Sequence, residues 1–128
     1  MKTFGEFFDE VRAWADESRH IEAVTSMDSW TKLVTPEKWQ EARDMELTEG
    51  LFLAFAQDMW VDFYEMLQHT CTDVLYARRM EQGHLFQTEI ASRARAYGLV
   101  VNREDSDHPL SFSDALIRAH KKRADAAH

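Results

Sequence analysis

A run of carboxylates and one histidine in the middle of the chain has the spacing of side chains that share one helix face. The residues are Asp58, Asp62, Glu65, His69 and Asp73. Each lies three or four positions from the next, and side chains at that spacing are neighbours on a helix. Carboxylate and imidazole groups serve both as metal ligands and as general acids or bases. The stripe therefore raises the question of a metal site or a catalytic site.

A second pattern, Glu-x-x-His, occurs twice, as Glu17 with His20 and as Glu81 with His84. Ferritin-like di-iron bundles use two such motifs and two further glutamates, all directed into the bundle core. Here Glu17 and His20 lie opposite the apolar stripe of their segment, so we expect them to face solvent. Gly83 interrupts the second pair. We predict no metal and no other cofactor, with a helical-bundle metal protein as an alternative.

Arg79 and His84 have the Arg-x4–6-His spacing of helical ribonucleases of the HEPN type, so the chain resembles that family at two residues. The same spacing recurs in Arg78/His84, Arg103/His108 and Arg123/His128. The family motif commonly has a polar residue after the arginine, whereas Met80 follows Arg79 here. The resemblance implies an RNase that uses Arg79 and His84. RNA cleavage that survives both Arg79→Ala and His84→Ala would eliminate that pair.

Motifs for phosphate binding and for nucleophilic hydrolysis are missing from the sequence. The four glycines are isolated from one another, and no Gly-x-Ser-x-Gly sequence occurs. The single cysteine, Cys71, cannot form an intramolecular disulfide, and it is typical of a small core residue in a reducing compartment. We therefore predict that the protein is not an enzyme.

The segment that must position the central carboxylates is residues 47–81, which we predict to be one long helix. Its apolar residues cover more than half of the helix circumference, and Gly83 is its predicted stop. An apolar arc that wide must be covered by neighbours on several sides. The sequence therefore predicts an all-α fold, a compact bundle of four main helices and one short helix around this central helix, in a single domain of residues 1–128.

Caps and periodicity predict the other helices at 3–22, 36–45, 85–97 and 111–125. Thr3-x-x-Glu6 is a capping box, Thr35-Pro36 is an N-cap followed by proline, and Gly98 is a C-terminal cap. Residues 24–35 lose the helical period and are predicted to form a loop. Polar residues at about 102–110 predict a hinge loop before the last helix.

The net charge of −8 is concentrated in the first half of the chain. Residues 1–65 have 15 acidic and 6 basic side chains, whereas residues 66–128 have 8 and 9. Such a field favours a basic protein partner and disfavours direct binding of nucleic acid. No apolar run approaches the roughly 20 residues of a membrane span, and the N-terminus lacks the features of a secretory signal. We predict a cytoplasmic protein with no membrane contact.

Aromatic composition and charge together favour a protein–protein interaction module. Four Trp, eight Phe and six Met residues are a heavy apolar load for 128 residues. Aromatic surface that the bundle leaves uncovered would form a homodimer face or a partner face. The predicted contact residues are Asp9, Glu10, Asp16, Glu17, Trp30, Trp39, Asp58, Asp62 and Glu65.

In size, charge and lack of catalytic motifs the chain resembles phage-encoded inhibitors such as anti-CRISPR proteins. No sequence motif carries this resemblance. It implies an inhibitor or adaptor that occupies the basic surface of a partner that handles nucleic acid.

Overall fold

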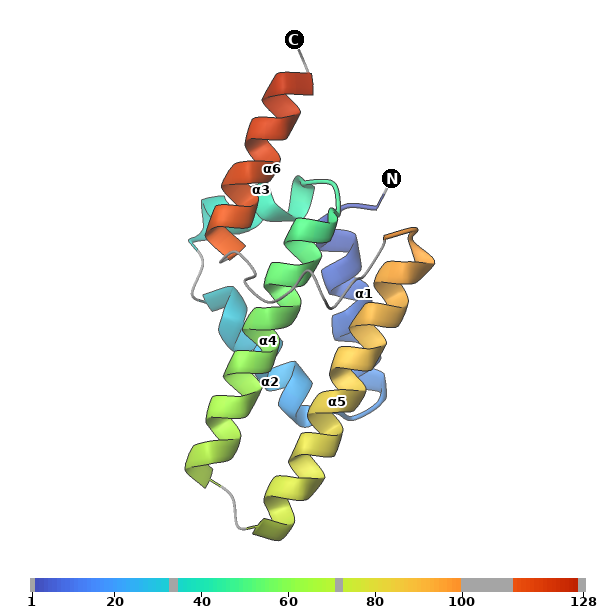
Figure 1. Ribbon diagram of the computed structural model, residues 1–128, viewed down its shortest axis with the longest axis vertical. Coiled ribbons are helices and arrows are strands. Elements are labelled where there is room, and N and C mark those ends of the chain that lie inside the picture. Colours follow the sequence, from blue (N-terminus) through green and yellow to red (C-terminus); the bar gives the residue numbers. More distant parts are fainter. Residues whose placement is uncertain (1, 33–34, 71–72, 100–111, 127–128) are drawn as a thin grey trace.

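The computed structural model describes residues 2–32, 35–70, 73–99 and 112–126, which form a bundle of helices (Figure 1). In chain order these are α1 (Phe4–Glu17), α2 (Ile21–Lys32), α3 (Pro36–Asp44), α4 (Glu49–Thr70), α5 (Asp73–Ala96) and α6 (Phe112–Ala126). The prediction of an all-α bundle is confirmed. Cys71 and the predicted hinge loop at about 102–110 lie outside the described residues.

The predicted central helix at 47–81 is wrong in its extent, because the segment belongs to two antiparallel helices, α4 and α5 (Figure 1). A single helix of that length would run about 50 Å, well beyond the roughly 30 Å of a small domain. Two shorter helices cover each other's apolar faces, and Gln87 Nε2 donates to the Ala56 carbonyl oxygen across 3.0 Å. Gly83, the predicted stop, is buried inside α5, which absorbs the helix predicted at 85–97.

The first helix also ends earlier than predicted, and most of the predicted loop at 24–35 is the helix α2. Arg19 adopts a left-handed φ of +56°, while His20 N–H donates to Ala15 O and Arg19 N–H donates to Asp16 O. These two bonds are a Schellman cap formed without glycine. In α2, Ala23, Met27 and Trp30 are buried at helical spacing.

Three predicted helix ends are confirmed. Thr3 Oγ1 accepts from Glu6 N–H at the start of α1, and Thr35 Oγ1 accepts from Lys38 N–H ahead of Pro36. Gly98 has a φ of +87°, and Leu99 N–H donates to Ala94 O beyond the end of α5. Each of these caps depends on residues next to it in sequence, so local pattern is enough to predict it.

Aromatic rings from α1, α2, α3, α4 and α6 meet in one group, here called the aromatic cluster. Its members are Phe4, Phe8, Trp30, Trp39, Phe55 and Phe112. Ring centroids in contact lie 4.8 to 6.2 Å apart, and all of these side chains except Trp39 are buried. Aromatic pairs at such separations contribute about 0.5–1.5 kcal/mol each beyond the area they bury. The cluster therefore fixes α1 firmly in the bundle.

The start of α1 is held against the connection between α3 and α4. Phe4 N–H donates to Met45 O across 2.8 Å, and Leu47 N–H donates to Lys2 O across 2.9 Å. At Gly5 the two segments come so close that an added Cβ would lie 2.9 Å from Arg43 Cβ and 3.0 Å from Arg43 O. Glycine is therefore required by this helix crossing.

No helix within the described part of the chain is both long enough and apolar enough to span a lipid bilayer.

Candidate functional site

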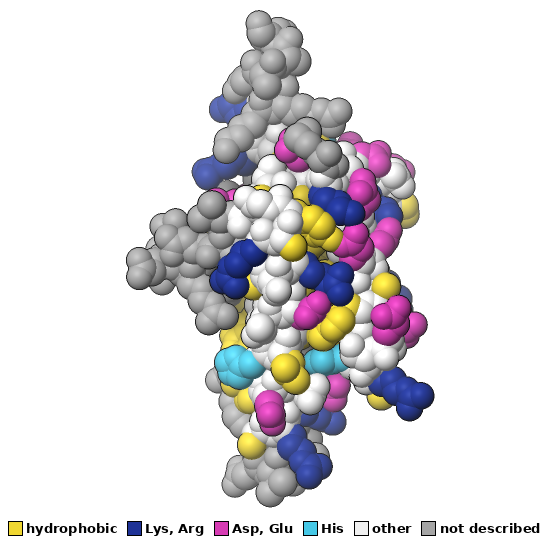
Figure 2. Space-filling model, turned by 90° about the vertical axis from the view of Figure 1, so that its right-hand side faces the viewer, with side chains coloured by type: hydrophobic (Ala, Val, Ile, Leu, Met, Phe, Trp, Pro, Cys, Tyr) yellow, Lys and Arg dark blue, Asp and Glu magenta, His cyan; other side chains and the backbone are white. Residues whose placement is uncertain are grey.

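The outer face of α1 is an acidic surface, here called the α1 face. The helix is strongly two-sided, since Phe4, Phe7, Val11 and Ala15 on its inner side are completely buried. Its outer side exposes Glu6, Asp9, Asp16 and Glu17 and leaves Glu10 half-buried. Figure 2 shows acidic side chains gathered on the side of the molecule where α1 lies. The inner aromatic stripe thus dictates which acids reach solvent.

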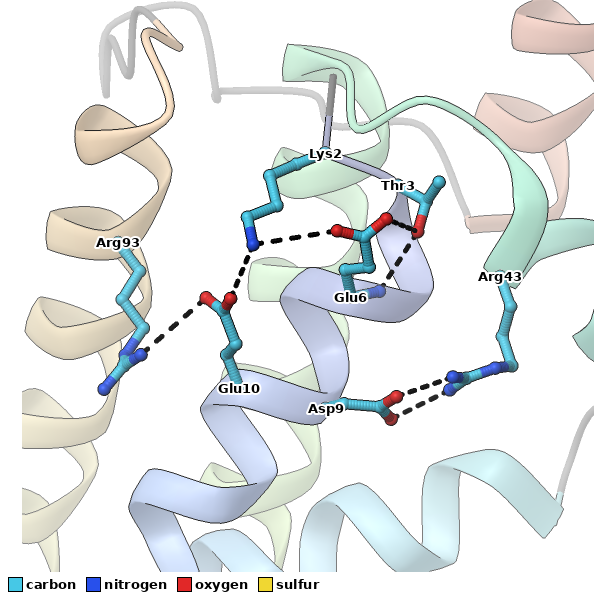
Figure 3. Close-up of polar contacts among 7 residues, drawn as sticks. All are labelled: Lys2, Thr3, Glu6, Asp9, Glu10, Arg43 and Arg93. Carbon is cyan, nitrogen blue, oxygen red and sulfur yellow. Dashed lines mark hydrogen bonds and ion pairs between the residues drawn. The ribbon is translucent and has the colours of Figure 1, made fainter.

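Basic side chains from neighbouring elements neutralise the acidic residues in the first turns of α1 (Figure 3). Arg43 of α3 binds Asp9 through two hydrogen bonds, of 2.9 and 2.6 Å, and the bond to Asp9 raises the pKa of the guanidinium. Glu10 accepts from Lys2 Nζ across 2.7 Å and lies 3.9 Å from Arg93 Nη1 of α5. These acids hold α1 between α3 and α5.

The acidic residues at the end of α1 have fewer basic neighbours. Asp16 has a 78% exposed side chain whose carboxylate lies 3.7 Å from Arg12, and Glu17 is exposed. The last turn of α1 contains no basic residue. Carboxylates at a helix C-terminus face the negative end of the helix dipole, which costs about 0.3–1 kcal/mol each. The helix dipole therefore disfavours both carboxylates, although Asp16 pairs with Arg12 one turn earlier.

Two predicted contact residues, Trp30 and Asp58, face each other inside the molecule. Trp30 Nε1–H donates to Asp58 Oδ2 across 3.0 Å, which links α2 to α4. Trp30 is only 7% exposed, and Asp58 is half-buried. Burial raises the pKa of Asp58, and the hydrogen bond from Trp30 opposes that shift. The prediction that Asp58 faces solvent with the other acids of its stripe is therefore wrong, because α2 covers this residue.

The remaining predicted contact residues are spread over α3 and α4. Trp39 is half-buried, with its ring 4.9 Å from that of Phe8 and the Arg43 guanidinium 5.7 Å above it. Asp62 and Glu65 are exposed on α4, as predicted for their stripe. The side chains of His69 and Asp73 lie outside the described residues. Trp39 therefore lies beside the α1 face, because the same Arg43 binds Asp9. In the described part of the chain, no hydrogen bond or ion pair links Asp62 or Glu65 to that face.

Arg79 and His84, the alternative catalytic pair, lie on the single helix α5. Five positions on a helix correspond to about 140° of rotation, so the two side chains leave α5 in different directions. Arg79 Nε is 4.0 Å from Glu22 Oε1, and the His84 ring is 5.3 Å from Trp60. Each contacts a different helix, α2 or α4. Their role in an RNase stays a prediction.

His20, predicted to face solvent with Glu17, is only 5% exposed, so that prediction is wrong. Its Nδ1 accepts from Ala23 N–H across 3.1 Å, which leaves Nε2–H to donate to the Gln82 carbonyl oxygen across 2.9 Å. The ring thereby caps the start of α2 and fastens it to α5. Among the described residues, no group of three or more His, Cys, Asp or Glu side chains is arranged to hold a metal ion.

Two surface groups were missed by sequence reasoning, one on α1 and one on α6. Glu6 belongs to the α1 face with the predicted acids, and its three- and four-residue spacing to Asp9 and Glu10 was the available signal. On α6, Ile117 is 66% exposed beside Arg118 and Lys121. Ile117 falls off the inner stripe of Phe112, Leu116 and Ala119, which is the pattern that could have shown it.

In comparisons with protein-family models, curated proteins and solved structures, the chain matches none of them.

Proposed function

We propose that this protein is a non-enzymatic inhibitor or adaptor that docks its α1 face on a basic surface of a protein that handles nucleic acid. The observation that carries the proposal is the placement of Asp16 and Glu17. They are exposed at the end of α1 that disfavours negative charge, and no basic residue lies in that turn. A partner that supplies Lys or Arg would remove this cost on binding.

The α1 face suits such docking because its framework is already ordered. The inner side of α1 is locked in the aromatic cluster, and its flanks are held by the pairs of Asp9 with Arg43 and Glu10 with Lys2. Binding through a preordered helix avoids the entropy cost of arranging the contact residues. Complementary charge also speeds encounter and selects the partner.

A nucleic-acid-binding groove is the kind of surface that this face fits. Such grooves present clustered Lys and Arg to phosphates. A row of carboxylates on a helix can compete for the same cations, which is how an acidic protein of this size would act as an inhibitor. The net charge of −8 adds long-range attraction to any such surface.

The test compares two charge-reversal variants that change the net charge equally. Asp16→Lys with Glu17→Lys alters the α1 face, and Asp62→Lys with Glu65→Lys alters the exposed acids of α4. Each variant is used to capture proteins from cognate lysate at increasing salt. We expect one partner that the first variant loses and the second retains. If both variants retain the partner equally, docking through the α1 face is contradicted. If both lose the partner equally, the loss comes from the change in net charge and not from the α1 face.

The inhibitor part of the proposal is tested with the purified partner. We expect nucleic acid and this protein to exclude each other from the partner, with the α1 variant unable to compete. Simultaneous binding of both would contradict competition for a basic groove.

A further inference from the structure

The outer side of α6, here called the α6 face, exposes the basic residues Arg118 and Lys121 and one carboxylate, Asp114, whereas the α1 face is mainly acidic. The inner side of the helix buries Phe112, Ala115 and Leu116 in the bundle. The outer side exposes Ile117, Arg118, Lys121 and the acidic Asp114, and Ile117 is 66% exposed. Lys121, four positions on, is the neighbour of Ile117 on this side of the helix, and Arg118 lies beyond Lys121. In the described residues neither of these two cations forms an ion pair. Figure 1 shows the later part of α6 extending beyond the other helices. Ile117, Arg118 and Lys121 are exposed and therefore accessible to another molecule.

The α1 face offers the matching arrangement. Ala13 is exposed at the centre of the α1 face. Its neighbours on the helix are Asp9, four positions earlier, and Asp16 and Glu17, three and four positions later. A small residue lets another helix approach closely, and the carboxylates surround that point. An exposed isoleucine with Lys121 and Arg118 to one side of it on α6 thus matches an exposed alanine on α1, beside which Asp16 and Glu17 lie exposed.

We propose that the α6 face of one copy of this chain docks on the α1 face of a second copy. Ile117 packs on Ala13, and Arg118 and Lys121 pair with Asp16 and Glu17. The contact joins two different surfaces, so it is heterologous, and a bound pair still offers one free α1 face and one free α6 face. Association therefore proceeds in a series that grows with concentration, rather than stopping at a symmetric dimer.

Charge and size determine how strong this contact is. Copies with a net charge of −8 repel each other at a distance, but at physiological ionic strength charges beyond about 8 Å are largely screened. One helix lying across another buries less than the roughly 1,000 Å² of a stable interface. The association is thus weak and reversible, and it is strongest at moderate salt, where repulsion is screened and contacting pairs persist.

This self-association goes beyond the proposed function, because it needs only this chain. It also has a regulatory consequence for that function, since α6 of a second copy occupies the acids that a basic partner would use. Concentrated protein would cover its own α1 face, and a partner would have to displace α6.

The test uses the full chain in analytical ultracentrifugation over a range of concentration and salt. One variant carries Arg118→Glu with Lys121→Glu, and the other carries Asp16→Lys with Glu17→Lys. We expect the unaltered protein to gain mass with concentration and each variant alone to keep the mass of a single chain. A mixture of the two variants restores opposite charges at every contact, so we expect association to return.

Unaltered protein that keeps the mass of a single chain at every concentration would overturn the proposal, as would a mixture that does not associate. Ile117→Ser is expected to weaken association, whereas Leu85→Ser, at a 51% exposed leucine on α5, is expected to leave it unchanged. Equal effects of these two changes would also contradict docking through α6. None of these results depends on a partner, so failure here would leave partner docking through the α1 face to be decided by the capture experiment alone.

Discussion

The indole Nε1–H of Trp30 donates a hydrogen bond to Asp58 Oδ2 across 3.0 Å, and this contact joins α2 to α4 in a half-buried position. A buried indole N–H needs an acceptor, and a partly buried carboxylate is costly to keep charged. The pair therefore fixes how α2 sits on α4 while opposing stability at neutral pH through its charge.

Asp58→Asn is expected to stabilise the protein at neutral pH. Burial raises the pKa of Asp58 above its ordinary 3.8, so the folded state binds the proton more tightly than the unfolded state does. The ionised carboxylate then opposes folding above the folded-state pKa, and this cost disappears as pH falls through that pKa. Asparagine keeps the acceptor for Trp30 without the charge. In urea unfolding, Asp58→Asn should have a larger free energy of unfolding than the unaltered protein at pH 7. This difference should decrease towards about pH 4.

Asp58→Ala is the matched comparison, because it removes both the charge and the acceptor. The unsatisfied indole N–H of Trp30 should cost about 1–3 kcal/mol. If Asp58→Asn were as destabilising as Asp58→Ala, the charge would be favourable and the pKa argument would fail.

Gly5→Ala is expected to destabilise the protein by about 1–3 kcal/mol, although alanine is the better helix former. The new Cβ would meet Arg43 Cβ at 2.9 Å and Arg43 O at 3.0 Å, and backbone atoms cannot move aside as a flexible side chain can. Gly50→Ala is the control, since its Cβ would come no closer than 4.0 Å, to Thr48 Oγ1. It should gain up to about 1 kcal/mol. Thermal unfolding that ranks the two variants in the opposite order would contradict the close crossing of α1 and α3.

Arg19→Gly is expected to stabilise the protein by about 0.5–1 kcal/mol. Arg19 holds a φ of +56°, a conformation that glycine adopts readily and other residues adopt at a cost. Ser18, one residue earlier, has an ordinary φ of −79°, so Ser18→Gly should destabilise instead. Chemical denaturation of both variants separates these effects, and a loss of stability in Arg19→Gly would show that the arginine side chain supports the turn.

His20→Ala is expected to destabilise the protein by about 2–4 kcal/mol, because it leaves Ala23 N–H without its acceptor and removes the hydrogen bond from the ring to the Gln82 carbonyl oxygen of α5. It also removes the ring packed 5.9 Å from Trp14 and 6.0 Å from Phe86. His84→Ala, at an exposed histidine on α5, should change the free energy of unfolding by less than about 0.5 kcal/mol. Similar values for the two variants would mean that His20 does not fasten α2 to α5.

Sequence reasoning succeeded where structure depends on nearby residues. Thr3, Thr35 and Gly98 act through neighbours three to five positions away, and the exposure of Asp9 and Asp16 follows from the aromatic stripe on the same helix. It failed at Arg19, because a left-handed residue without glycine leaves no local mark. A tertiary contact, from His20 to Gln82, supports that turn.

The division of the predicted 47–81 helix has a similar cause. Thr70, Cys71, Thr72 and Asp73 all rank low in helix propensity, which was the only local signal for a break. Two antiparallel helices are more stable than one long helix because α5 packs on α4. The helical periodicity of the sequence does not predict this tertiary packing. Asp58 was misplaced for the same reason, since its cover is Trp30 from a different helix.

Phe112, at the start of α6, lies 5.1 Å from Phe4 and 4.8 Å from Trp30, so the first and last helices close the same aromatic cluster. During synthesis the N-terminal helices leave the ribosome with this group of rings still open on one side. Until α6 emerges, the nascent chain exposes large apolar surfaces to which other proteins can bind. Completion of the core is therefore a late step in the folding of the chain.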